Sequence, residues 1–204
     1  MNESNFIYRN HQPRKFDELY TPEYAVYPIV QRLNEFQFEI NKHLKILEPF
    51  SNGHNIAKIL RQERYEVIET HLESGQDFFD IDKDFLKKHK IDVIVSNPPY
   101  SIKNQVLQHT FDLDIPFIYL LPINVLSSKK RSKMLWDRIE DISIVIYDGR
   151  ISFMEKKNSW FNNILLCYKV PYTPNYQITY AFIDEGCKSY YDYWIHQTDK
   201  TLGD

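Results

Sequence analysis

The sequence predicts an α/β fold with a mostly parallel, doubly wound β-sheet. Predicted strands alternate with predicted helices over most of the chain, as they do in proteins of this class. Two of the strands, IDVIVS at 91–96 and FIYLL at 117–121, are apolar almost throughout, which is typical of strands buried on both faces. Ligands of such sheets bind at the carboxyl ends of the strands, near the place where the strand order reverses.

Local patterns justify the elements in turn. Apolar residues recur at threes and fours between Ala25 and Phe36, which indicates an amphipathic helix that begins near Thr21 as its cap, with Pro22 in its first position. The segments 164–170 and 176–183 are expected to form an antiparallel hairpin at one edge of the sheet. The two apolar strands lie within 90–96 and 116–123, and the other predicted strands are 43–49, 65–71 and 142–149. The other predicted helices are 55–63, a short one within 77–89, 104–113 and 130–140.

The composition is that of an ordinary globular protein, with 43% hydrophobic and 26% charged residues among 204. We expect one domain at 19–204 after a polar segment at 1–18. No apolar stretch approaches the roughly 18 to 20 residues needed to cross a bilayer, and the polar start lacks a secretory signal, so a cytoplasmic protein that binds no membrane is predicted. Cys167 and Cys187 have neither CxxC spacing nor nearby paired histidines, which predicts incidental thiols and no metal site.

The formal net charge of -3 gives the chain no general attraction to nucleic acid. A phosphate contact would therefore have to come from a local basic patch. The segment SSKKRSK at 127–133 is such a patch.

The tetrapeptide Asn97, Pro98, Pro99 and Tyr100 follows the apolar strand at 91–96. Two consecutive prolines cannot donate to a sheet and restrict the preceding residue to extended geometry, so the strand ends at Asn97. The turn thereby holds an amide and a phenol at the carboxyl end of a buried strand. A generic Asn-Pro pair would only end the strand and satisfy local backbone groups, with Tyr100 packed in the core, but the full tetrapeptide is more specific.

The tetrapeptide resembles the catalytic loop of S-adenosylmethionine-dependent amino-methyltransferases, especially the DNA adenine-N6 group, in which it reads D/N/S-P-P-F/Y/W. The resemblance implies a Rossmann-like class I methyltransferase fold and methyl transfer from S-adenosylmethionine to the exocyclic amine of adenine in DNA. The Asn97 side-chain oxygen and the Pro98 carbonyl would hold both amine hydrogens and localise the nitrogen lone pair toward the methyl group. Tyr100 would stack on a base flipped out of the duplex.

Three other segments resemble cofactor motifs of the same group, in the order typical of small phage and plasmid enzymes. KILEPFSNGHNI at 45–56 resembles the strand-turn-helix I-L-E-P-x-x-G-x-G-x-I that holds the methionine part of the cofactor. ELYTPEY at 18–24 resembles the preceding Y-T-P segment, and GQDFFD at 75–80 resembles the DFF that binds the cofactor adenine. The residues thereby implied to bind S-adenosylmethionine are Tyr20, Thr21, Glu48, Pro49, Asn52, Gly53, Asn55, Glu69, His71, Asp77 and Phe78.

The glycine turn of the cofactor motif is altered. With Glu48 and Ile56 aligned, the two expected glycines fall at Asn52 and His54, and Gly53 lies between them. Asparagine tolerates left-handed geometry better than most residues, but the histidine adds bulk where the cofactor would pass.

The position expected to bind the cofactor ribose is also altered. The acidic residue that ends the second strand in the resemblance is aligned with His71, so either Glu69 or Glu73 would take its place or the ribose would be held in a different way. Both departures keep open a catalytically inactive methyltransferase-fold protein that acts as a nucleic-acid-binding or accessory module.

Basic and polar side chains near the predicted rim are expected to contact DNA. SSKKRSK follows the strand at 116–123, and GRISFMEKKNSWFNN at 149–163 resembles the loop before the final strands of phage-type relatives. A solvated charge run and a tryptophan in the core are the alternatives. The side chains concerned are Lys103, Lys129, Lys130, Arg131, Lys157, Asn158 and Trp160.

The sequence leaves the means of target recognition open. No separate target-recognition domain is visible, so either loops read a short DNA site or a partner subunit reads it, and a homodimer is a further possibility. Similar tetrapeptides act on RNA bases and on the glutamine side chain of proteins, which is a second alternative. The resemblance predicts a bacterial, phage or plasmid protein of the restriction-modification type.

Overall fold

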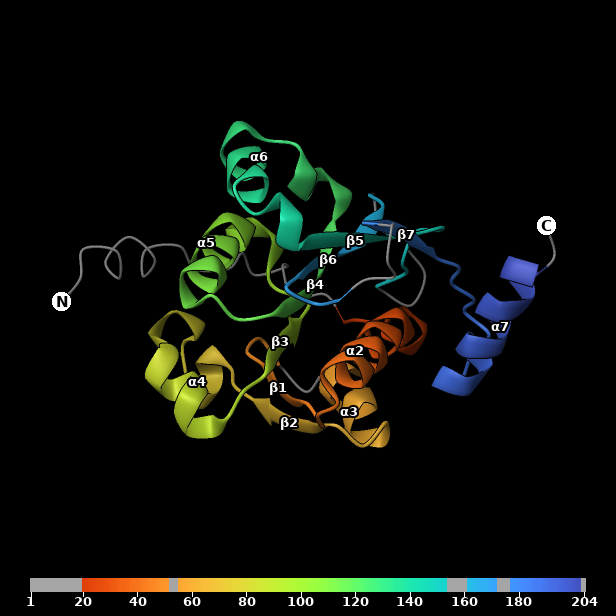
Figure 1. Ribbon diagram of the computed structural model, residues 1–204, viewed down its shortest axis with the longest axis horizontal. Helices are drawn as coiled ribbons and strands as arrows, with labels where there is room; N and C mark the ends of the chain where they lie inside the picture. The colour runs from red at the N-terminus through yellow and green to blue at the C-terminus, as the bar shows by residue number, and fades with distance from the viewer. Residues whose placement is uncertain (1–19, 52–54, 154–160, 172–176, 203–204) are drawn as a thin grey trace.

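The computed structural model describes residues 20–51, 55–153, 161–171 and 177–202. These residues form a seven-stranded sheet in the order β2-β1-β3-β4-β6-β5-β7 (Figure 1). The strands are β1 (Lys45–Glu48), β2 (Glu66–Glu69), β3 (Val93–Ser96), β4 (Phe117–Pro122), β5 (Ile142–Tyr147), β6 (Asn163–Tyr168) and β7 (Ile178–Ala181). The α-helices are α2 (Tyr27–Ile40), α3 (Asn55–Gln62), α4 (Lys83–His89), α5 (Lys103–Leu113), α6 (Lys129–Trp136) and α7 (Tyr190–Leu202).

The sheet is mostly parallel, with antiparallel pairing toward one edge, as predicted. β2, β1, β3 and β4 pair in parallel, and so do β5 and β7, while β6 runs antiparallel to β4 and β5. The expected partner of the segment at 164–170 was wrong, because β6 pairs with β5 and not with β7. The burial explains this: every residue of β6 is buried, which suits an inner strand, whereas β7 leaves Ile178 and Tyr180 exposed at the edge.

Helices cover both faces of the sheet (Figure 1). Residues of α2, α3 and α7 join one hydrophobic core, and residues of α4, α5 and α6 join the other. Successive side chains of a strand point to opposite faces, so Val93 and Val95 of β3 pack in the first core and Ile94 packs in the second. The strand ends are thereby held between two packed layers.

Two helical regions differ from the prediction. The first helix begins at Tyr27, after the 3₁₀ turn η1 (Glu23–Ala25), and Thr21 does not cap it. The hydroxyl of Thr21 instead accepts a hydrogen bond from Asn97. Helix α7 was not predicted, although Tyr193 of this helix is buried against Tyr27 with ring centroids 6.2 Å apart.

Membrane-spanning helices, metal-binding groups and cysteines can be considered for the described part of the chain. None of its helices combines the length and apolar surface that a bilayer-spanning segment requires. Its side chains form no group of three His, Cys, Asp or Glu suited to hold a metal ion. Cys167 is buried and Cys187 half-buried, and both thiols are free.

Candidate active site

The carboxyl ends of β1 and β3 meet around the buried side chain of Glu48, which is 3% exposed. Ser96 Oγ donates a hydrogen bond of 2.5 Å to Glu48 Oε1, and the Phe50 backbone N–H donates to the same oxygen at 3.2 Å. The other oxygen, Oε2, is buried and has no hydrogen-bond partner among the described residues. Burial, with a smaller contribution from nearby Glu69, raises the pKa of Glu48 to about 8. This carboxyl is therefore suited to a cationic partner.

Glu69 ends β2 directly beside Glu48, since the two residues are paired in the register of β1 and β2. Ser51 Oγ donates a hydrogen bond to Glu69, and Arg61 of α3 forms an ion pair with it. His71 lies after β2, where its ring nitrogen Nδ1 accepts a 3.2 Å hydrogen bond from the Glu73 backbone N–H at the start of the 3₁₀ turn η2 (Leu72–Ser74). Of the residues considered for the ribose, Glu69 is the one that lies beside Glu48 at the strand ends.

The Tyr20 and Thr21 segment joins this rim through Asn55, the first residue of α3. Asn55 Nδ2 donates to the Thr21 carbonyl at 2.9 Å, and Tyr20 Oη donates to Asn55 Oδ1 at 2.7 Å. Thr21 Oγ1 accepts a hydrogen bond of 3.1 Å from Asn97 Nδ2. Residues from three predicted motifs are thus linked.

The tetrapeptide leaves β3 as predicted, with Pro98 and Pro99 buried and Asn97 half-buried. Tyr100 is 9% exposed, and its hydroxyl accepts a hydrogen bond of 3.1 Å from Asn163 Nδ2 at the start of β6. Its ring meets Phe161 edge-on with centroids 5.5 Å apart. The orientation of Tyr100 is therefore fixed by residues far along the chain.

The turn at Asp77 and Phe78 packs against Phe50, which follows β1. Asp77 Oδ1 accepts a hydrogen bond of 3.0 Å from the Phe79 backbone N–H and so caps the 3₁₀ turn η3 (Phe78–Asp80). Phe78 is 2% exposed, with its ring centroid 4.9 Å from that of Phe50. His109 of α5 supports this turn, because its Nε2 lies 3.0 Å from the Ile81 carbonyl, and burial lowers the pKa of the imidazole.

The basic residues expected to contact DNA differ in their surroundings. Lys129 and Lys130 are exposed at the start of α6, immediately after the turn that follows β4. Lys103 Nζ donates to the Tyr100 carbonyl at 2.9 Å. Arg131 donates to the carbonyls of 124, 125 and 127 and to the Asn104 side chain, so its guanidinium fastens the turn η5 (Ile123–Leu126) to α5.

Some predicted site residues lie outside the described part of the chain: Asn52, Gly53, His54, Lys157, Asn158 and Trp160. Conversely, the structure brings Phe50, Ser51, Ser96 and Asn163 to the site, although sequence reasoning did not single them out. The sequence does contain a feature that could have indicated Ser96, because it is a polar residue at the end of an apolar strand. Nothing local marks Asn163, which is 63 positions from Tyr100.

The architecture matches that of solved methyltransferase structures. A protein from Listeria monocytogenes assigned as a class I S-adenosylmethionine-dependent methyltransferase superposes with a TM-score of 0.54, over 96% of this chain and 79% of its own, at 13% sequence identity. The chain has the class I methyltransferase fold. No protein-family model and no curated protein matches its sequence.

Two subunits of restriction-modification systems share this methyltransferase fold. The modification subunit of a type I restriction enzyme assigned in Vibrio vulnificus matches with a TM-score of 0.57 and 13% identity, over 91% of this chain and 54% of its own. The type I methyltransferase subunit from Streptococcus thermophilus matches with a TM-score of 0.52 and 14% identity, over 78% of this chain and 46% of its own. The chain spans about half the length of these two subunits.

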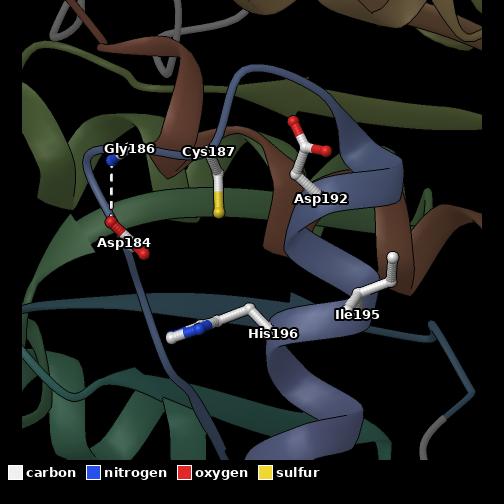
Figure 2. A pocket seen from close by; sticks show the side chains of 6 residues that line it. All are labelled: Asp184, Gly186, Cys187, Asp192, Ile195 and His196. Atoms are coloured by element: carbon white, nitrogen blue, oxygen red, sulfur yellow. Dashed lines mark hydrogen bonds between the residues drawn. The ribbon is translucent and has the colours of Figure 1, made fainter.

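A separate pocket of about 380 Å³ lies between the loop at 184–187 and helix α7 (Figure 2). Asp184 accepts a 2.7 Å hydrogen bond from the Gly186 backbone N–H within this loop, and His196 extends toward it from α7. The residues that line this pocket, Asp184, Gly186, Cys187, Asp192, Ile195 and His196, include none of those around Glu48 and Asn97.

Proposed function

We propose that the protein transfers a methyl group from S-adenosylmethionine to the exocyclic N6 amine of adenine in DNA. The observation that carries the proposal is the junction of β1 and β3, where Asn97 and Pro98 follow the residue that binds Glu48. Amide and carbonyl oxygens able to hold an amine thus lie beside a buried carboxyl suited to a cation. The methyltransferase fold, and its occurrence in methylation subunits of type I restriction-modification systems, support this assignment.

Glu48 fits the cationic amino end of S-adenosylmethionine. Its buried Oε2 lacks a partner among the described residues, and an ammonium donor would satisfy that oxygen and lower the pKa of the carboxyl. Glu69 at the end of β2 would bind the ribose hydroxyls, and Asp77 with Phe78 would hold the adenine. The bound cofactor supplies an electrophilic methyl group on its sulfonium.

The tetrapeptide would orient the target amine. Because a carboxamide is planar and Asn97 Nδ2 donates to Thr21, the Asn97 oxygen is turned away from Thr21. This oxygen and the Pro98 carbonyl would accept the two amine hydrogens and direct the nitrogen lone pair toward the methyl group. Alignment carries the step and no proton need be removed before attack, because the methyl group leaves a sulfonium, which becomes a neutral thioether. The methylated amine would then release its extra proton to water.

Tyr100 would stack on the flipped base. Asn163 holds its hydroxyl and Phe161 packs against its ring in a T-shaped pair, so the ring would be positioned before the base arrives. Such stacking contributes about 1 to 3 kcal/mol per base in single-stranded complexes. Extrusion of the base from a duplex costs a few kcal/mol, which this contact would partly offset.

Lys129 and Lys130 are the proposed phosphate contacts, because both are exposed beside the turn that follows β4. Arg131 is left out of this role, since its guanidinium already donates four hydrogen bonds within the chain. The DNA sequence would be read by loops or by a partner subunit.

The proposal is tested with isotopically labelled S-adenosylmethionine and separate samples of duplex DNA, single-stranded DNA and total RNA. We expect label in the N6-methyladenine of DNA, and its loss in Asn97→Ala with cofactor affinity nearly unchanged. Asn124→Ala is the matched control, because it removes an exposed amide from the turn after the neighbouring strand and should retain activity.

Other results of this assay would change the proposal in defined ways. Label in RNA, or in glutamine of an added protein substrate, would replace DNA as the substrate. Cofactor binding without label anywhere would support the inactive, accessory form of the fold. Equal loss of cofactor binding and turnover in Asn97→Ala would refute the role given to Asn97.

A further inference from the structure

We propose that Thr21 is a positioning residue that holds the Asn97 carboxamide in place beside the target amine, and that Asn55 holds Thr21 in place. The inference rests on the proposed function, because Thr21 would act through Asn97. Its basis is the hydrogen-bonded series from Asn55 through Thr21 to Asn97, which spans segments 34 and 76 positions apart.

The first step of the series has one possible orientation. The Thr21 backbone carbonyl can only accept a hydrogen bond, so the Asn55 atom that faces it at 2.9 Å must be the amide nitrogen. Asn55 Oδ1 then faces the Tyr20 hydroxyl, which donates to it at 2.7 Å. With Asn55 only 5% exposed, this amide fixes the backbone at residue 21 to the start of α3.

The second step runs through the side chain of Thr21, which is 1% exposed. A β-branched side chain is restricted in χ1, so a fixed backbone and close packing together limit the directions open to the hydroxyl. Thr21 Oγ1 lies 3.1 Å from Asn97 Nδ2 and accepts its hydrogen bond. The nitrogen side of the Asn97 carboxamide is therefore held against Thr21.

The orientation matters because the two ends of a carboxamide have opposite hydrogen-bonding character. With the nitrogen against Thr21, an acceptor is presented to the amine hydrogens. In the flipped orientation two N–H donors would face two N–H donors, and the amine would be repelled instead of held.

The kinetic test compares Thr21→Val, which keeps the shape and removes the hydroxyl, with Thr21→Ser, which keeps the hydroxyl. For Thr21→Val we expect kcat to fall about 10- to 100-fold, as for a misplaced catalytic group, with KM for DNA and the affinity for S-adenosylmethionine within about twofold. Thr21→Ser should restore kcat to within about threefold of the wild type. A fall in cofactor affinity equal to the fall in kcat in Thr21→Val would overturn the positioning role.

A second measurement does not depend on turnover. In an ¹⁵N-labelled protein, one side-chain NH₂ proton of Asn97 should be shifted downfield and exchange slowly with water, should lose both features in Thr21→Val and should keep them in Thr21→Ser. A signal unaffected by Thr21→Val would overturn the inference even if the enzyme is active. The expected signal in a protein that labels no substrate would support the hydrogen bond while the proposed function fails.

Discussion

Glu48 makes the stability of the protein depend on pH in a way that Glu48→Gln should remove. Its pKa is raised from the ordinary 4.5 to about 8 by burial, so the folded protein binds this proton more tightly than the unfolded chain. A raised pKa in the folded state contributes stability that is fully present below about 4.5 and is lost as the pH rises through about 8. At 1.36 kcal/mol per pKa unit the whole window corresponds to about 5 kcal/mol, of which about 4 kcal/mol is lost by pH 7.5.

The glutamine variant provides the reference for this measurement. Its carboxamide can accept from Ser96 and Phe50 as the carboxyl does, and its NH₂ group resembles a protonated carboxyl at the Oε2 position. At about pH 5 the two proteins should therefore have similar free energies of unfolding, whereas near pH 7.5 the variant should be more stable by up to about 4 kcal/mol.

Urea unfolding from about pH 5 to pH 8.5 measures this difference. Cofactor binding should be lost in the variant, and in the wild type near pH 7 it should release close to one proton, detected by calorimetry in buffers of different ionisation enthalpy. A free-energy difference between the two proteins that does not change with pH would refute the reasoning.

Three further predictions concern other parts of the molecule. Lys129→Glu with Lys130→Glu should reduce the salt dependence of DNA affinity by about two counterions, measured by fluorescence anisotropy, and an unchanged slope would exclude α6 from the contact. Lys90→Gly should stabilise the protein by about 0.5 to 1 kcal/mol in urea unfolding, because Lys90 ends α4 with φ at 55°, and a loss of stability would contradict this. Asn163→Ala should cost about 1 to 3 kcal/mol, and a double-mutant cycle with Tyr100→Phe should show coupling near 1 kcal/mol, whereas additive losses would mean that their hydrogen bond contributes nothing.

The layers of the fold could be predicted because they depend on local patterns. β3 and β4 are apolar runs bounded by turn residues, and the alternation of strands and helices gives the parallel sheet. The position of β6 in the strand order could not be predicted, because a hydrophobic segment does not reveal which strands it will pair with. Only the packing of both faces and both edges decides that this strand lies between β4 and β5.

The candidate site was predictable where a motif carries it and not where the contact is long-range. Glu48 and Asn97 could be proposed from the sequence because each belongs to a recognisable local segment. The bonds that orient them come from Ser96, 48 positions from Glu48, and from Thr21, 76 positions from Asn97. Sequence separation of this size leaves no periodic signal, so Thr21 was assigned to a helix cap that the structure does not contain.

Three places where local rules fail lie at the same rim of the sheet. Glu48 is a carboxyl that ends an apolar strand in a buried position, where an apolar residue would be more stable. Ser96 ends the fully buried strand beside it, and Thr21 turns its hydroxyl away from the helix that it precedes. A sequence selected for stability alone would not collect three such residues around one point. Departures of this kind are expected where a fold serves a ligand, so the conflict with local preference is itself an argument that this rim is the functional site.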